Sequence, residues 1–430
     1  MNKFQSFIES KIMPSVVKFT TIPFVSAVKD GMIAAMPFLV VGSIGLIITS
    51  LPIPGWSDIL AGSFAGTTIK DALSIWSKVT FDLFGLISII CISYYYSQKL
   101  KVDALFGSIL TVVAFAMVTP LSVVIEETST AAIPLKWLGS NGIFVGIIIS
   151  FLAVKIYAYC IHKDIVIKMP DSVPANVVKA FGAMVPIFFV MVLCFVIRYA
   201  SILLGYESFH TLIQNTLAIP LKALGGSLFG VLVSVFLMSF FWCFGIHGSA
   251  IVTGVMNPIW LALQAENFAL YEQGLEVTNI ITKTFVDFTK LGGTGFTLPL
   301  LLMFVFFAKS QQLKQLGKVS LVPGLFNINE PIIFGAPIVM NPILMIPFIL
   351  APVVMTLITY ASMVTGLVPL PTGITLPWAM PGLISGYLIT NSIRGLILQV
   401  VLIAVGFVIY YPFFKAYDKS LVEAEQANQK

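Results

Sequence analysis

Uncharged, apolar runs of membrane-spanning length restrict the fold of this chain more than any other feature. A helix needs about 20 mostly apolar residues to cross the hydrocarbon core of a bilayer. Nine such runs are clear, and they cover residues 30–50, 80–98, 103–125, 140–160, 180–204, 224–246, 291–308, 343–366 and 393–414. Only 10% of the 430 residues are charged, against about 25% in soluble domains. The sequence therefore predicts an all-α polytopic membrane protein.

Lysine positions predict the topology, because basic residues concentrate on the cytoplasmic side of a membrane. Four lysines in residues 3–29 precede the first run, and further clusters lie at 309–318 and 415–419. These clusters fall on one side only if the shorter uncharged run 248–264 also crosses the membrane. We therefore expect about ten transmembrane helices, with both termini cytoplasmic.

Two apolar stretches in the second half, about 323–341 and 373–390, are broken by Pro, Gly and Asn. Non-helical backbone at membrane depth is tolerated where it is buried in protein or lines a watery cavity, and interrupted segments point to a transporter's binding site. We expect both stretches to be re-entrant hairpins. The domains then expected are 1–204 with spans one to five, an amphipathic interfacial linker at 205–223, and a transport domain at 224–430 with spans six to ten.

Glu330 is the most informative single residue. Between Lys318 and Lys415 the only charged residues are Glu330 and Arg394. A carboxylate inside a span costs about 2.5–3.5 kcal/mol and normally faces a cavity with a partner. Pro331 disfavours helical backbone at Glu330, so neighbouring backbone groups become free for other partners. Contact with a ligand or proton is one interpretation of Glu330, and a purely structural salt bridge to Arg394 is the other.

Other polar groups in the second half complete a candidate site. His247 lies in "FWCFGIHGSA" between two glycines, either as a functional group or as a satisfied core histidine. Gly293 and Thr294 lie in "KLGGTGFTLP", as a ligand-binding turn or as small residues that permit close helix packing. Trp378, in the second broken stretch, is either an interfacial anchor or a platform for a sugar ring. The amides come from Asn327 and Asn329.

This set of side chains suits a neutral ligand rich in hydroxyl groups. Carboxylate and amides exchange hydrogen bonds with hydroxyls, while an indole covers the apolar face of a sugar. An anionic ligand would need several basic groups, and a metal ion would need more carboxylates and histidines at ligand spacing. Scattered lysines without a basic block argue against nucleic acid. We expect neither a metal nor a cofactor.

The stretch "FNINEPIIFGAPIVMNP" (326–342) resembles the signature of the membrane component, enzyme IIC, of the lactose/cellobiose/diacetylchitobiose family of the bacterial phosphotransferase system. "MPDSVPANVVKAFGAMVPIF" (169–188) and "FGIHG" support that resemblance, which covers essentially the whole chain. It implies a homodimer of ten-span protomers with two re-entrant hairpins, embedded in the lipid of the bacterial cytoplasmic membrane. The first half would form the dimer contact, and the second half would hold a β-linked disaccharide.

The resemblance also implies site roles. Glu330 and Asn329 would bind the hydroxyl that becomes phosphorylated, with His247 close by as a second group that positions the hydroxyl or accepts its proton. Gly293–Thr294 and Trp378 would contact the sugar rings. The phosphoryl group would come from a phosphocysteine on a separate IIB protein at the cytoplasmic face, since no IIB-like segment is expected in this chain.

The function predicted is therefore the permease subunit of a protein-Npi-phosphohistidine–sugar phosphotransferase for cellobiose or diacetylchitobiose, with lactose less favoured. Whether the permease alone counts as an enzyme is left open. The alternatives are an ion-coupled secondary sugar transporter, in which Glu330 would be the coupling carboxylate, and a membrane-embedded enzyme.

Overall fold

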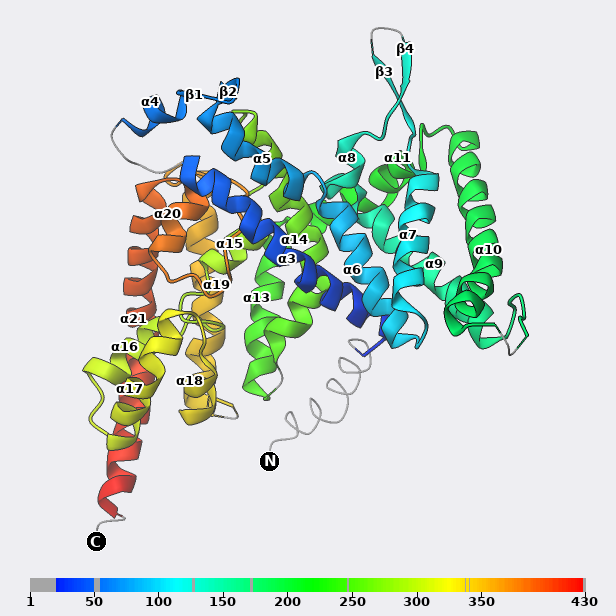
Figure 1. Ribbon diagram of the computed structural model, residues 1–430. Helices are drawn as coiled ribbons and strands as arrows, with labels where there is room; N and C mark the ends of the chain where they lie inside the picture. Colours follow the sequence, from blue (N-terminus) through cyan, green and yellow to red (C-terminus); the bar gives the residue numbers. More distant parts are fainter. Residues whose placement is uncertain are drawn as a thin grey trace. The chain divides into compact units, whose positions relative to one another are not determined.

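The structure is a computed structural model, and it describes residues 21–49, 55–125, 128–170, 173–245, 247–336, 338–339 and 341–427. The chain in these ranges is mostly α-helical, with two short antiparallel β-hairpins, β1–β2 and β3–β4 (Figure 1). It divides into two compact units. The first comprises Met1–Gly45 and Asp71–Lys222, and the second comprises Leu46–Lys70 and Ala223–Lys430.

The first unit is a bundle in which α6, α7, α9 and α10 pack against one another. Small residues allow helices of this unit to approach closely: a Cβ on Gly146 of α9 would lie 2.3 Å from Cγ1 of Ile89 on α6, and one on Gly31 of α3 would lie 2.6 Å from Cα of Ile92, also on α6. The elements that lie wholly or mostly in this unit are α3 (Pro23–Thr49), α5 (Ile69–Phe81), α6 (Phe84–Lys99), α7 (Ala104–Val118), β3 (Ser122–Ile125), β4 (Thr128–Ala131), α8 (Leu135–Leu138), the 3₁₀ turn η2 (Ser140–Gly142), α9 (Ile143–His162), α10 (Ala175–Leu203), α11 (Phe209–Ile213), the π-helical turn η3 (Gln214–Ala218) and α12 (Ile219–Gly225).

In the second unit, α19 packs against α13 and α21, while α16 packs against α17 and α21. Tyr410 on α21 donates a hydrogen bond from its hydroxyl to the carbonyl of Gly295, at 2.6 Å, and so fixes the turn that precedes α16. The elements of this unit are α4 (Trp56–Leu60), β1 (Ser63–Phe64), β2 (Thr67–Thr68), α13 (Leu228–Cys243), α14 (Gly248–Glu272), α15 (Lys283–Phe288), α16 (Leu298–Phe306), α17 (Gln311–Leu325), α18 (Glu330–Gly335), α19 (Pro342–Val364), α20 (Ile384–Thr390) and α21 (Ile393–Ala427).

Non-helical backbone in the second unit is held by polar side chains of α14. Asn267 donates to the carbonyls of Asn279, at 2.7 Å, and Pro371, at 2.8 Å. One turn earlier, Gln264 donates to the hydroxyl of Thr375, at 2.7 Å, and accepts from the amide of Thr284, at 3.0 Å. Backbone groups without helical partners must be satisfied in this way when water is excluded. Two side chains three residues apart on α14 therefore tie the irregular segment 369–377 to Asn279, in the irregular segment 275–282, and to Thr284 at the start of α15.

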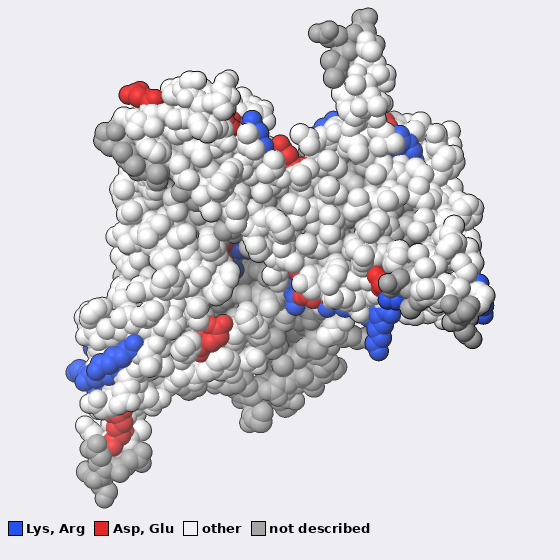
Figure 2. Space-filling model, in the orientation of Figure 1, with Lys and Arg blue, Asp and Glu red and all other residues white. Residues whose placement is uncertain are grey.

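Length and composition identify five helical stretches of the described chain that could cross a membrane: Ile69–Lys99, Ser140–His162, Val177–Leu203, Pro342–Val364 and Ile393–Ala427. The pair Phe209–Gly225 and Leu228–Cys243, bent by 64°, would be a sixth if it forms one span. Uncharged side chains cover most of the face shown in Figure 2, and many large apolar residues are exposed, among them Phe188 and Val408. Such broad apolar exposure is typical of a surface that contacts lipid. The predicted helical membrane fold is confirmed at this level.

Each of the ten predicted spans corresponds to a helix, but one is much shorter than expected. The apolar run 291–308 contains a helix only over Leu298–Phe306, because the glycine-rich turn before it adopts positive φ angles. Both broken stretches interrupt the helices as expected: 323–341 includes the end of α17 and the short α18, and 373–390 is irregular up to α20. The hairpins β1–β2 and β3–β4 had no predicted counterpart. The count of ten spans remains a prediction.

Candidate functional site

The glycine-rich turn before α16 is shaped to receive the segment 326–330. Gly292, Gly293 and Gly295 have φ angles of 76°, 95° and 85°, which glycine adopts without the steric cost that a Cβ brings. A Cβ on Gly293 would lie 2.5 Å from Cγ of Asn329 and 2.7 Å from the carbonyl oxygen of Asn327. Only glycine at this position allows the two segments to touch.

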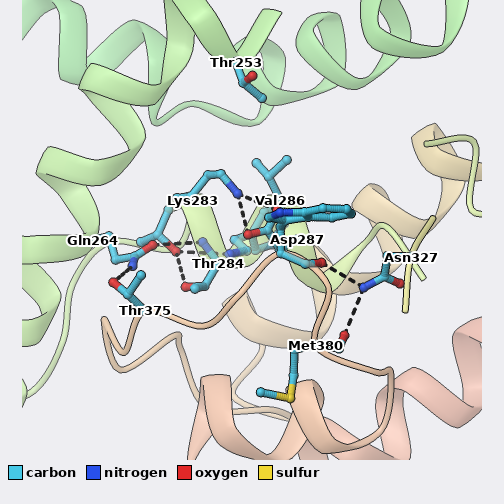
Figure 3. A network of polar contacts seen from close by, with 12 residues as sticks. Thr253, Gln264, Lys283, Thr284, Val286, Asp287, Asn327, Thr375 and Met380 are labelled. Atoms are coloured by element: carbon cyan, nitrogen blue, oxygen red, sulfur yellow. Dashed lines mark hydrogen bonds and ion pairs between the residues drawn. The ribbon is translucent and has the colours of Figure 1, made fainter. Parts of the chain in front are cut away.

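Asn327 and Asn329 fix the predicted site segments to one another. Asn327 accepts from the amide of Gly292, at 2.9 Å, and donates to the carbonyls of Trp378, at 3.0 Å, and Met380, at 2.9 Å (Figure 3). Asn329 is 4% exposed and donates to the carbonyl of Thr294, at 2.6 Å, and to the hydroxyl of Thr297, at 3.0 Å. Both amide hydrogens of Asn329 are thus used inside the protein, which leaves only its oxygen for a ligand.

Thr294 connects the same turn to α14. It is 9% exposed, and its hydroxyl lies 2.6 Å from the hydroxyl of Ser249, in the first turn of α14. Its carbonyl meanwhile accepts from Asn329. Thr294 therefore mainly holds the glycine-rich turn against α14 and Asn329. Its partner Ser249 was not among the residues predicted from the sequence.

His247, two residues before Ser249, and Glu330, directly after Asn329, face one another. Nε2 of His247 lies 4.0 Å from Oε1 of Glu330, and the two side chains are 54% and 46% exposed. His247 directly precedes α14, and Glu330 opens α18 next to Pro331. Two ionisable side chains from segments far apart in sequence therefore face one another and remain accessible.

The ring of His247 has a defined tautomer. Its Nδ1 accepts a hydrogen bond of 3.1 Å from the backbone N–H of Ala250, so a lone pair, and not a proton, must be on Nδ1. In the neutral ring the proton is then on Nε2, the nitrogen that faces Glu330. This arrangement makes His247 a hydrogen-bond donor and Glu330 the acceptor of the pair.

Trp242 supports the imidazole from the end of α13, and the sequence analysis did not single it out. The two ring centroids are 4.5 Å apart, and Phe334 of α18 approaches the indole edge-on at 6.1 Å. Trp242 is buried, and its indole N–H has no partner among the described residues. Trp242 lies in a long apolar run, so its sequence context did not mark it as a site residue. Its position five residues before a lone histidine could have indicated contact with the imidazole.

Trp378 presents its indole to the outside of the protein. The side chain is 58% exposed, while its backbone carbonyl is held by Asn327. A tryptophan with fixed backbone and open ring faces is available to stack on a ligand.

Arg394 does not pair with Glu330. It is exposed at the start of α21, whereas the ionic contact of Glu330 within the described part of the chain is His247. The structural interpretation of Glu330, a salt bridge to Arg394, is therefore not supported.

Together these observations define a class of protein: a helical membrane protein whose second unit carries an accessible carboxylate–imidazole pair beside immobilised amides and an open indole. Residues 29–352 match the family model described as phosphotransferase system, EIIC. The chain is 44% identical to the cellobiose-specific EIIC component of the phosphotransferase system from Geobacillus stearothermophilus, over 100% of this chain and 97% of that protein.

Two further relatives bear on function. The crystal structure of the transporter ChbC, the IIC component from the N,N'-diacetylchitobiose-specific phosphotransferase system, matches with a TM-score of 0.94 and 41% identity over 98% of this chain and 99% of that chain. The lactose-specific EIICB component from Staphylococcus haemolyticus (strain JCSC1435) is 32% identical over 100% of this chain and 73% of that protein.

The chain belongs to the EIIC family of the phosphotransferase system. The resemblance seen in the segment 326–342 is thereby confirmed. Members of this family are membrane permeases that take a sugar substrate and work with an EIIB component.

Proposed function

We propose that this permease carries a β-linked disaccharide of the cellobiose or diacetylchitobiose type across the cytoplasmic membrane and presents one of its hydroxyls to a phosphorylated IIB protein. Relatives named for cellobiose and diacetylchitobiose share 44% and 41% identity with the chain, and the relative named for lactose shares 32%. This ranking supports the two former substrates over lactose.

The main support for this proposal is the distance between Nε2 of His247 and Oε1 of Glu330. Their facing atoms are 4.0 Å apart, too far for a direct hydrogen bond but suited to one shared hydroxyl. An oxygen placed about 2.8 Å from each atom would see them about 90° apart, near the directions of its own proton and lone pair. Nε2–H of His247 would donate to that oxygen, and the hydroxyl would donate to Glu330.

Phosphoryl transfer then follows from this geometry. The hydroxyl oxygen attacks the phosphorus of the phosphocysteine on IIB, the new O–P bond forms as the S–P bond breaks, and the hydroxyl proton passes to Glu330. The chain itself supplies position and a proton acceptor. His247, held with its proton on Nε2, keeps the hydroxyl in line.

The other predicted residues would shape the rest of the site. Trp378 would cover the apolar face of a sugar ring. Gly293 and Thr294 would form one wall of the site. Asn329 would contact the ligand only through its side-chain oxygen, because its amide hydrogens already bind Thr294 and Thr297.

We further propose the membrane arrangement expected from the sequence. Each protomer would have ten spans with cytoplasmic termini and re-entrant paths at 323–341 and 373–390. Two protomers would form a homodimer through residues 1–204, surrounded by lipid. The apolar surface of the described helices supports immersion in lipid.

Phosphoryl transfer to the sugar in vitro tests the proposal. Purified permease would be incubated with phosphorylated IIB and cellobiose, diacetylchitobiose or lactose in separate reactions, and sugar phosphate would be measured. We expect rapid product formation with at least one of the first two sugars, slower formation with the variant His247→Asn, and the slowest with Glu330→Gln. Transfer that is equally fast without the permease, or with both variants, would contradict the proposed site.

A further inference from the structure

A buried ion pair on α15 has no place in the site described so far. Nζ of Lys283 donates to both carboxylate oxygens of Asp287, at 2.6 and 2.5 Å. Lys283 is 7% exposed and Asp287 is 21% exposed. Two charges buried to this extent need a reason, because an ion pair is often less stabilising than apolar side chains of the same volume.

Helix α15 is also held by hydrogen bonds that do not involve this pair. The hydroxyl of Thr282 caps the helix by accepting from the amide of Phe285, at 3.2 Å. The amide of Thr284 is held by Gln264, which also binds Thr375 (Figure 3). The helix therefore has neutral hydrogen bonds that hold it besides the ion pair.

The pair has unused hydrogen-bonding capacity. The ammonium group of Lys283 has three hydrogens, and the carboxylate of Asp287 has about four acceptor positions. Within the described chain each group pairs only with the other. Lys290, half-buried one turn later, is attracted by Asp287 and repelled by Lys283, so the carboxylate lies between two positive charges and remains an acceptor.

The helix that carries the pair leads into the proposed sugar site. Its helix continues directly into the glycine-rich turn: the amide of Lys290 donates to the carbonyl of Asp287, at 3.0 Å, and the amide of Gly293 donates to the carbonyl of Lys290, at 2.8 Å. Figure 3 shows Lys283 and Asp287 in the same close view as Asn327, which holds the backbone of Trp378. Backbone hydrogen bonds thus join the end of the helix that carries the ion pair to the turn that contains Gly293, which would contact the sugar.

We propose that Lys283 and Asp287 form a subsite that binds two neighbouring hydroxyls on the second ring of the disaccharide, the ring that is not phosphorylated. Lys283 donates to one hydroxyl oxygen and Asp287 accepts from the other. An adjacent cation and carboxylate match the donor and acceptor of a vicinal diol. This inference rests on the proposed function, and it makes the ion pair the group that distinguishes a disaccharide from a monosaccharide.

Binding measurements on Asp287→Asn and Lys283→Gln test this assignment, with cellobiose and methyl β-glucoside as ligands. We expect disaccharide affinity to fall about 10-fold to 100-fold, since hydrogen bonds to charged groups are lost, and monosaccharide affinity to change less than about twofold. The matched control is Asp418→Asn. Asp418 is a buried carboxylate of the same unit that accepts from the amides of Lys309 and Ser310, and its loss should leave the ratio of the two affinities unchanged.

The wild-type protein supplies a second test that does not depend on whether the variants fold. Cellobiose analogues that each lack one hydroxyl of the second ring should bind about tenfold more weakly where that hydroxyl contacts the pair, and Asp287→Asn should abolish the difference. Equal loss for both ligands, or indifference of the wild type to every such deletion, would overturn the subsite while the proposed function stands. Failure of wild-type protein to bind any disaccharide would overturn both.

Discussion

The substitution Glu330→Gln separates the two contributions that the carboxylate makes. Gln keeps the length of the side chain and an oxygen that accepts from the sugar hydroxyl, but it cannot take the proton. The affinity should change little: a hydrogen bond to a charged group contributes about 1.5–3 kcal/mol and a neutral one about 0.5–1.5 kcal/mol. The difference of about 1–1.5 kcal/mol corresponds to about tenfold in Kd.

The rate of phosphoryl transfer should fall much further in the same variant. A positioned general base contributes about 10²- to 10⁴-fold, and the geometry around His247 leaves Glu330 as the one acceptor of the facing pair, because Nδ1 of the ring is occupied by Ala250. The expected signature is therefore a rate reduced at least 100-fold with affinity reduced no more than about tenfold.

Single-turnover transfer from phosphorylated IIB at saturating disaccharide gives the rate, and titration calorimetry gives the affinity. Glu423→Gln is a matched control, since Glu423 is an exposed carboxylate paired with Lys419 at 3.8 Å on the same unit, and neither quantity should change. Equal losses of rate and affinity would refute the proton-acceptor role and leave Glu330 as a positioning group.

Three further substitutions probe other parts of the site. His247→Asn retains a side-chain acceptor that can cap α14 but removes the Nε2–H donor, so transfer should fall about 10-fold to 100-fold with an unchanged melting temperature; a lowered melting temperature with normal transfer would indicate a structural histidine. Trp378→Ala should weaken the binding of every disaccharide tested by calorimetry about tenfold or more, and unchanged affinity would make the indole an interfacial anchor. Gly293→Ala places a methyl group 2.5 Å from Asn329 at a φ of 95°, so we expect disaccharide binding to be lost and thermal stability to fall; normal binding would show that the turn does not shape the site.

The helical membrane character of the fold could be predicted because long apolar runs are a strong signal in membrane proteins. Each predicted span has a helix at the corresponding place. The shortening of the run 291–308 could not be predicted from hydropathy, because Gly292 and Gly293 are compatible with helix packing as well as with a turn. The strands β3 and β4 were missed because their residues continue an apolar span and then a polar loop without a clear alternation.

The residues of the candidate site could be predicted, but not which of them bind a ligand and which fix the turn. Glu330 and His247 stood out as ionisable groups in apolar sequence, and the structure brings them together. Asn329 and Thr294 were expected to bind the sugar directly, whereas their hydrogen bonds show that they also fix the turn. Sequence spacing cannot reveal which donors and acceptors of a side chain are already bound to other protein groups.

Lys283 and Asp287 escaped the sequence analysis for a different reason. A lysine and an aspartate four residues apart are usually an exposed helical ion pair, and nothing in the sequence gives their depth. Their burial follows from the irregular segments that Gln264 and Asn267 tie to α14, which are long-range contacts. The apolar residues Phe285 and Val286 between the charges were the only local sign.

The chemical form of the sugar after uptake tests the central claim most directly. Proteoliposomes containing the permease would enclose phosphorylated IIB, with labelled cellobiose or diacetylchitobiose supplied outside. The account predicts that the label accumulates inside as sugar phosphate, only with the phosphorylated partner, and independently of ion gradients. Accumulation of free sugar, driven by a proton or sodium gradient and indifferent to IIB, would contradict the account and make Glu330 the coupling carboxylate of a secondary transporter.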